Sequence, residues 1–356
     1  MWILLLFGSV VNAKEFTKEV KKSTFISPYG LVDLTNTKGT IDVRTWDKKE
    51  VRIEVLITVN ARNETDADNV FERIRILFNS HGKKVTAKTE IQEMPKWSWN
   101  YVRSEYTVDY TVYMPKTCNL NLFNKFGDAF ISEISGTATL SVQHGNIRLN
   151  TVERQLKLDL KYGNCTVARA NNSEINMIHG NIRLKKANDI NLYTSYSKVN
   201  VDEADFITCR TLNDTYVIGL VKEFNNRGKY DNIKITKANN IVVVSKFSDF
   251  NINEIQRSAN FEMTNGSVVI KEVAQGFSDV LMIGEQTDFQ IEVEKGTNYK
   301  MNATSRHANL KFPKTYNVVS KDDQGSEQKV EFYVGKKVNP YSYIKAKVKY
   351  GDLSVK

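Results

Sequence analysis

The feature that most constrains the fold is a short motif that recurs about every 17 residues through the middle of the chain. Its middle positions run from residue 127 to residue 266 in eight steps, so 139 residues divided by eight gives a period of about 17.4. Most copies begin with an aromatic residue or histidine, and short runs of alternating apolar residues follow several of them. The copies are Phe126-Gly127-Asp128, His144-Gly145-Asn146, Tyr162-Gly163-Asn164, His179-Gly180-Asn181, Tyr196-Ser197-Lys198, Leu212-Asn213-Asp214, Tyr230-Asp231-Asn232, Phe247-Ser248-Asp249 and Asn265-Gly266-Ser267.

A period of this length with alternation inside it predicts one coil of a β-solenoid per repeat. A single repeat cannot bury its apolar face, so the coils stack and share one core. We therefore expect a mainly β protein, built as a single-stranded parallel β-helix with coils of 17–18 residues. Two more copies, His307-Ala308-Asn309 and Tyr350-Gly351-Asp352, follow at irregular intervals.

Equivalent residues in stacked coils form columns, which predicts two structural ladders. The chain contains 35 asparagines, and a ladder at the coil corners explains this excess, because Asn tolerates turn geometry and bonds its neighbour above. The aromatic-or-His ladder comprises Phe126, His144, Tyr162, His179 and Tyr196, and the asparagine ladder comprises Asn146, Asn164 and Asn181.

Histidines and cysteines suggest neither a metal site nor a cofactor. His144 and His179 fall two coils apart, at roughly 9–10 Å, which is too far for two ligands of one ion. Cys118, Cys165 and Cys209 form no CxxC pair, and their odd number makes a poor disulfide framework. We expect them to be small buried residues.

The net charge of +9 and the pI of about 9.1 permit an anionic partner. Basic and acidic residues alternate along the chain, whereas nucleic-acid sites need a concentrated basic patch. We therefore predict no nucleic-acid partner. The mature chain also contains no stretch of 18 apolar residues that could span a membrane.

Residues 1–13 resemble a signal peptide, with an apolar run and a small-residue ending at Ala13. This predicts export to the periplasm, the outer surface or the medium. The segment is short and has no basic residue at its start, so a buried apolar strand is the alternative.

Residues 14–115 form an N-terminal β region that we expect to cap the solenoid of residues 116–356. Asn63 and the acidic residues after it suit a helix start. Val70, Phe71, Ile74, Leu77 and Phe78 then recur at helical spacing, which predicts one helix over residues 65–78. We expect this helix to pack against the open end of the solenoid, where an uncovered strand edge would invite aggregation.

Trp97, Trp99 and Tyr101 alternate, so on a strand they share one face. Aromatic rings on an exposed face can stack on sugar rings, which makes these three the candidate ligand-binding residues. The alternative is that they cover the core beneath a loop, as large aromatic side chains commonly do.

The chain resembles a bacterial family of unknown function, the "putative adhesin" β-strand-repeat proteins related to auto-transporter adhesin head domains. The resemblance covers residues 28–356. It is carried by Gly39-Thr40-Ile41-Asp42-Val43 with Trp46-Asp47, the helix at 65–78, Val112-Tyr113-Met114-Pro115 and the repeated coils. It implies a parallel, right-handed β-helix in an exported protein and supplies no catalytic residues.

The function that these features favour is a non-enzymatic envelope or cell-surface protein, an adhesin or a scaffold, with a glycan or a surface protein as partner. A polysaccharide-binding or polysaccharide-degrading β-helix protein and an envelope-sensing component are the alternatives. A glycosidase needs two carboxylates about 5–10 Å apart. Asp128, Asp214 and Asp249 are expected at equivalent places in coils that are not neighbours, so we predict no enzyme.

Overall fold

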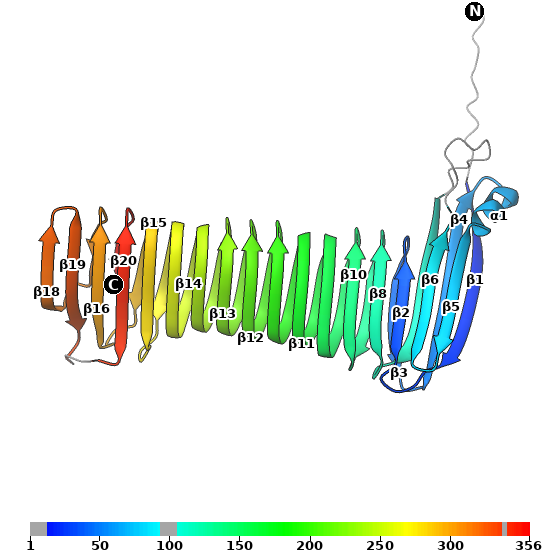
Figure 1. Cartoon of the computed structure of the whole chain (residues 1–356), viewed down its shortest axis with the longest axis horizontal. Coiled ribbons are helices and arrows are strands. Elements are labelled where there is room, and N and C mark those ends of the chain that lie inside the picture. The colour runs from blue at the N-terminus through cyan, green and yellow to red at the C-terminus, as the bar shows by residue number, and fades with distance from the viewer. Residues whose placement is uncertain (1–12, 93–104, 337–339) are drawn as a thin grey trace, which may run out of the picture. The chain divides into compact units, whose positions relative to one another are not determined.

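The computed structural model describes residues 13–92, 105–336 and 340–356, and the protein is mainly β. In these residues there is one helix, α1 (Glu64–Phe71), and the strands belong to one long mixed sheet that is not closed (Figure 1). The strands are β1 (Lys14–Phe25), β2 (Leu31–Asn36), β3 (Ile41–Trp46), β4 (Glu50–Ala61), β5 (Ile74–His81), β6 (Lys84–Ile91), β7 (Glu105–Pro115), β8 (Asn119–Lys125), β9 (Ala129–Ile134), β10 (Thr137–Gln143), β11 (Ile147–Ser195), β12 (Lys198–Leu212), β13 (Thr215–Lys229), β14 (Asn232–Val273), β15 (Asp279–Val293), β16 (Tyr299–Arg306), β17 (Leu310–Lys311), β18 (Asn317–Gln324), β19 (Glu327–Val334), β20 (Ser342–Lys349) and β21 (Leu353–Val355).

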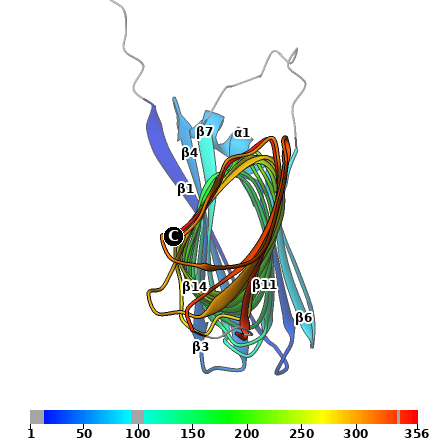
Figure 2. The ribbon, with the colours of Figure 1, turned by 90° about the vertical axis from the view of Figure 1, so that its left-hand side faces the viewer.

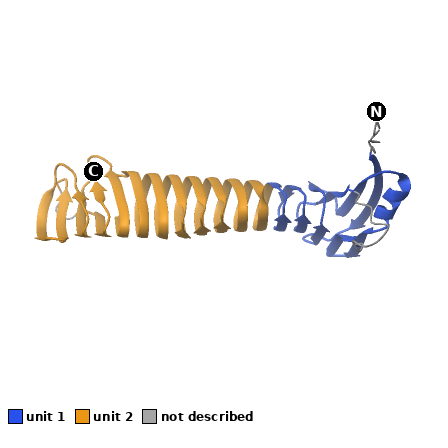
Figure 3. Ribbon diagram, turned by 90° about the horizontal axis from the view of Figure 1, so that it is seen from above, with its two compact units in different colours: residues 1–149 blue, residues 150–356 orange. Residues whose placement is uncertain are grey.

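The chain divides into two compact units, residues 1–149 and residues 150–356 (Figure 3). In unit 1, one series of paired strands runs β1, β4, β7, β3 and β9, and the other runs β5, β6, β2, β8 and β10. Alternate residues of β2, β4, β7, β8 and β10 are buried. Strand β1 has no buried residue, and β5 has one, Ile74. Thr89 on β6 and Tyr110 on β7 share a buried hydrogen bond of 2.7 Å between their hydroxyl oxygens, which joins the two series.

The helix of unit 1 is shorter than the sequence predicts. Asn63 caps its start, because its side-chain oxygen accepts a hydrogen bond of 2.9 Å from the backbone N–H of Asp66. The helix ends at Phe71, and the predicted residues 74–78 lie in strand β5. Ile74, Ile76 and Phe78 also alternate at strand spacing, and their hairpin with β6 decides between the two patterns. Helix α1 contacts β4, β1 and β5.

From the end of β11 to the start of β14, unit 2 repeats a parallel pairing in which each residue lies opposite the residue 17 positions further on. Asn181 pairs with Lys198, Lys198 with Thr215 and Thr215 with Asn232. The offset is 21 residues over most of the pairing between β14 and β15. In Figure 2 the successive repeats of unit 2 overlie one another, and in Figure 3 their strands lie side by side. Side chains alternate between a buried interior face and an exposed outer face, so every repeat contributes equivalent columns to both faces.

The three cysteines are buried and unpaired, as the sequence predicts. Cys165 and Cys209 lie on the interior face of unit 2, and burial raises the pKa of each thiol to about 12. Neither thiol therefore forms a reactive thiolate near neutral pH.

One residue at a corner of each repeat has a left-handed backbone, which non-glycine residues adopt uncommonly. The φ angle is 53° at Tyr196, 57° at Asn213 and 63° at Tyr230. The sequence alignment is therefore wrong by one residue in one repeat: Asn213, not Leu212, takes the place of the aromatic residue. This repeat has neither an aromatic residue at the corner nor a glycine after it, so its motif fits two alignments that differ by one residue.

The residue after each left-handed corner turns inward in the middle of unit 2, where a ladder of hydrogen bonds joins successive repeats. Asp214 Oδ1 accepts from the backbone N–H of Ser197 at 2.7 Å, and Asp231 Oδ1 accepts from that of Asp214 at 2.9 Å. Ser248 Oγ accepts from the N–H of Asp231 at 3.0 Å. Asp214 is thus a buried corner residue, and the predicted equivalence of Asp214 with the exposed Asp249 is wrong.

The strand order of unit 2 departs from chain order after β15. Strand β20 lies between β15 and β16 and pairs in parallel with both (Figure 1). Glu285 on β15 and Lys349 on β20, which form an ion pair, are 64 residues apart in sequence. The hairpin of β18 and β19 pairs with β16 on the other side. The β18–β19 hairpin and β20 explain the long interval before the motif copy at Tyr350. The interval before His307 contains one more left-handed corner, at Gln286, where φ is 51°.

Candidate functional site

The candidate ligand-binding residues from the sequence, Trp97, Trp99 and Tyr101, lie outside the described residues, as do residues 1–12 of the predicted signal peptide. The predicted domain boundary at residues 115 and 116 falls inside unit 1. The candidate site in the described chain is therefore built from other side chains.

The outer face of unit 2 is hollowed over five successive repeats, with a volume of about 690 Å³. Strand β11 contributes three segments, β12 one segment and β13 one residue. The alternation of the strands directs every second side chain of these segments outward. The lining consists of residues 159–161, 176–178, 193–195 and 210–212 together with Arg227.

A column of polar and charged side chains runs through this hollow at intervals of 17 residues. Its members are Asp159, Asn176, Tyr193, Arg210 and Arg227. Tyr193 pairs in register with Arg210, and Arg210 with Arg227. The Arg210 guanidinium lies 5.8 Å from the centre of the Tyr193 ring, and that ring is 42% exposed. The hollow thus combines an accessible aromatic ring with two adjacent cations.

The left-handed corner residues border the hollow, because each directly follows an outward-facing residue of its lining. The His179 ring stacks between two tyrosines, with ring centroids 5.3 Å from Tyr162 and 5.0 Å from Tyr196. In unit 1, the rings of Phe126 and His144 stack at 5.1 Å. Stacking of this kind offsets part of the cost of the left-handed backbone.

The asparagines after the corners bond between repeats on the exposed side. Within unit 2, Asn181 Nδ2 donates to Asn164 Oδ1 at 2.7 Å. In unit 1, the backbone N–H of Asn146 donates to Asp128 Oδ1 at 2.7 Å. These residues form hydrogen bonds with one another, which favours a structural role for them over ligand binding.

Behind the hollow, the interior of unit 2 holds two buried carboxylates with neutral partners. Thr194 Oγ1 donates to Asp214 Oδ2 and Thr211 Oγ1 to Asp231 Oδ2, both at 2.6 Å. Burial raises the pKa of Asp231 to about 6 and also raises that of Asp214, although these hydrogen bonds act in the opposite direction. Gly228 makes room for this network, since a Cβ there would lie 2.2 Å from Asp231 Oδ2.

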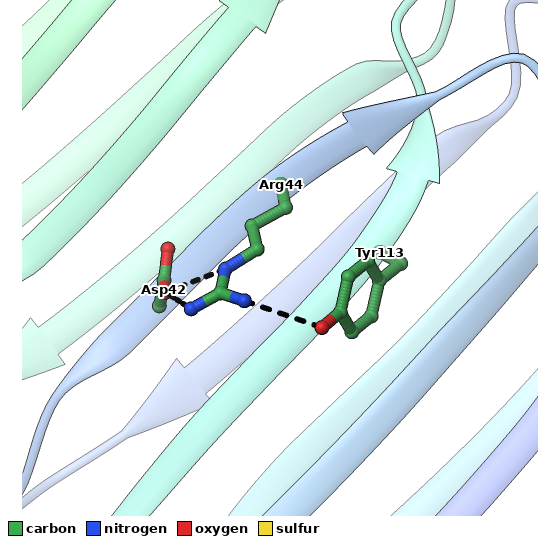
Figure 4. A network of polar contacts seen from close by, with 3 residues as sticks. All are labelled: Asp42, Arg44 and Tyr113. Atoms are coloured by element: carbon green, nitrogen blue, oxygen red, sulfur yellow. Dashed lines mark hydrogen bonds and ion pairs between the residues drawn. The ribbon is translucent and has the colours of Figure 1, made fainter.

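A second group of aromatic and cationic side chains lies on unit 1. The rings of Trp46 and Tyr113 stack at 5.3 Å, and the Arg52 guanidinium lies 4.4 Å from the Tyr113 ring centre. Arg44 donates to Asp42 at 2.7 and 2.9 Å and to the Tyr113 hydroxyl at 3.3 Å (Figure 4). Arg52 forms an ion pair of 3.1 Å with Glu54. Each arginine of this group has its own carboxylate.

Metal-binding and membrane-spanning features are both missing from the described part of the chain. It contains no group of three or more His, Cys, Asp or Glu side chains that could hold a metal ion. It also contains no helix with the length and apolarity that a membrane span requires.

The hollow was not predicted from the sequence, although a signal for it was present. Tyr193, Arg210 and Arg227 follow one another at the repeat period, just as the corner residues do. Extending the 17-residue alignment from the corners to the outward positions would have placed the three side chains in one column.

No family model matches the chain, and no curated protein matches it. Several solved structures are similar to it at low identity. A putative cell adhesion protein from Clostridium sporogenes is 9% identical, with coverage of 95% of this chain and 99% of that one and a TM-score of 0.17. A putative lipid binding protein from Parabacteroides distasonis is 9% identical, covers 96% of both chains and has a TM-score of 0.21. A putative adhesin from Bacteroides fragilis is 10% identical, with coverage of 95% and 97% and a TM-score of 0.23. TM-scores this low give no support to any particular function, so the function must be inferred from the geometry of the chain itself.

Proposed function

We propose that this chain is a non-enzymatic exported protein that folds as a β-solenoid and binds a glycan at the cell surface, as an adhesin does. The solenoid is supported by the parallel register of 17 residues in β11 to β14 and by the left-handed corner in each repeat. Export is supported by the apolar, small-residue sequence of residues 1–13. Residues 14–115, with helix α1, act as the N-terminal cap.

The hollow around Tyr193 carries the binding proposal. It is elongated over successive repeats, it is open to solvent, and it offers an exposed ring beside hydrogen-bond donors and acceptors. An extended glycan chain requires a surface of this kind, on which one sugar ring stacks on the aromatic face while hydroxyl groups bond to the flanking polar side chains.

Hydrolysis of a glycan is a less favourable reading of the same surface. A glycosidase needs a pair of carboxylates flanking the scissile bond, and Asp159 is the only carboxylate among the described residues that line the hollow. Asp214 and Asp231 lie on the interior face and are 2% and 4% exposed, so they do not reach a ligand in the hollow.

A glycan array probed with the full chain and with the Tyr193→Ala variant tests the proposal. We expect the parent chain to bind a subset of glycans and the variant to lose most of this binding. Tyr343→Ala is the matched control, because Tyr343 is an exposed ring on β20, 47% exposed and outside the hollow. Equal binding by the parent and the Tyr193 variant, or binding to no glycan, would contradict the proposal.

A further inference from the structure

Two arginines lie directly opposite each other on neighbouring strands, with no described carboxylate paired to either. Arg210 on β12 pairs in register with Arg227 on β13, and neighbouring strands are about 4.8 Å apart. Like charges that face each other across strands destabilise a sheet. Within the described residues, neither guanidinium forms an ion pair. The arrangement therefore costs stability that no counter-charge in this part of the chain offsets.

Several other cationic side chains of unit 2 have carboxylate partners. Arg183 pairs with Asp202 at 3.3 Å, Lys186 with Glu203 at 2.8 Å and Lys237 with Glu254 at 3.0 Å, each in the following repeat. These ion pairs contrast with the two arginines of the strand face that forms the hollow.

The positive charge extends along this face into the next repeat. Lys229 lies two residues beyond Arg227 on the same exposed side, and it pairs in register with Lys246. Lys229 also lies 4.6 Å from the centre of the Tyr230 ring, so its ammonium group is held near the corner that borders the face. A ligand that follows the column from Tyr193 therefore meets cations in successive repeats.

We propose that the hollow binds a linear acidic polysaccharide that runs across the strands. One sugar ring stacks on Tyr193, and acidic groups on the following sugars pair with Arg210 and Arg227. Arg guanidinium groups suit this task because their planar donors bond carboxylate or sulfate groups in pairs. This inference rests on the proposed glycan-binding function and adds the charge of the ligand.

Binding of the full chain to four polymers tests the inference: polygalacturonate, which carries carboxylates, heparin, which carries sulfates as well, neutral dextran, and double-stranded DNA. Affinity is measured at physiological ionic strength for the parent, Arg210→Ala, Arg227→Ala, the double variant and Tyr193→Ala. Arg183→Ala is the matched control, because it removes an exposed arginine of unit 2 outside the hollow. Circular dichroism confirms that each variant is folded.

We expect at least one acidic polysaccharide to bind and dextran not to bind. Each arginine variant should lower the affinity about tenfold and the double variant about a hundredfold, with Arg183→Ala unchanged. The preference between polygalacturonate and heparin identifies the acidic group. Tyr193→Ala should weaken polysaccharide binding and leave any weak DNA binding unaltered, because stacking on a sugar differs from charge attraction.

Other outcomes overturn the inference in distinguishable ways. Dextran binding that requires Tyr193 but neither arginine would refute the acidic ligand and leave the proposed glycan-binding function standing. Binding to none of the polysaccharides would refute both. Equal affinity for DNA and the acidic polysaccharides, with no dependence on Tyr193, would mean that the surface attracts any polyanion.

Discussion

The aromatic and cationic side chains of unit 1 and those of unit 2 are alike in composition and opposite in how their charges are balanced. Around Trp46 and Tyr113, Arg44 is held by Asp42 and Arg52 by Glu54. Around Tyr193, Arg210 and Arg227 have no carboxylate partner among the described residues, and the carboxylates of the adjoining corners, Asp214 and Asp231, are buried on the interior face. The two groups of side chains have similar composition, so composition does not distinguish them. What differs is whether a carboxylate lies beside each arginine.

The largest expected difference between the two regions is in the pH dependence of the free energy of unfolding, and it comes from the buried Asp231 of unit 2. The pKa of Asp231 is about 6 in the folded chain, against about 3.9 for an unfolded aspartate, so the folded state binds this proton more tightly. The contribution of Asp231 to the free energy of unfolding is therefore fully present below about pH 4, and it is lost as the pH rises through about 6. The shift corresponds to roughly 2–3 kcal/mol.

Asp231→Ser should remove much of this dependence, because serine occupies the equivalent corner in two nearby repeats, at Ser197 and Ser248. Chemical denaturation of the parent and the variant between pH 4 and pH 7 measures it. The variant should gain stability relative to the parent as the pH rises. A difference that is constant across this range would show that the buried carboxylate does not titrate there.

The second expected effect is on ligand affinity, and it comes from placing a carboxylate beside Arg227, as unit 1 has beside Arg44. Asn225→Asp places a carboxylate two residues before Arg227, which is the spacing of Asp42 and Arg44. Neutralising one guanidinium should give about a tenfold lower affinity, or about 1.4 kcal/mol, for the acidic polysaccharide that the parent chain binds. Asn225→Ser is the neutral control in the same binding titration. An unchanged affinity in the aspartate variant would show that Arg227 does not contact the ligand.

The smallest effect is on stability without any ligand. Arg52→Ala removes contacts with two aromatic rings and an ion pair, so the free energy of unfolding should fall by about 1 kcal/mol. Arg227→Ala removes a cation that faces another cation, so unfolding should become no easier and the change should stay within about 0.5 kcal/mol. Urea titrations of both variants make the comparison. A larger decrease in the free energy of unfolding for Arg227→Ala would mean that the Arg227 side chain makes stabilising contacts within the chain.

The sequence predicted those features of the repeats that local chemistry marks. Aromatic residues and glycines at the corners made the period visible, and period-2 alternation indicated strands. At Asn213 the corner has no aromatic residue and no glycine follows it, so the motif there fits two alignments that differ by one position. Ile74 and Phe78 fit both the helical and the strand period, so the sequence predicts too long a helix. Only the pairing of β5 with β6 distinguishes the two patterns. The hollow and the position of β20 depend on contacts between residues that are distant in the chain.

The insertion of β20 between β15 and β16 also sets an order in which the strands can pair during folding. Strands that pair in chain order can assemble one after another, but β15 and β16 are not bridged until residues 342–349 have joined them. Up to that moment both strands present open edges, which are the surfaces most prone to join other chains. A chain that ends within the β18–β19 hairpin would therefore leave β15 and β16 without their shared neighbour.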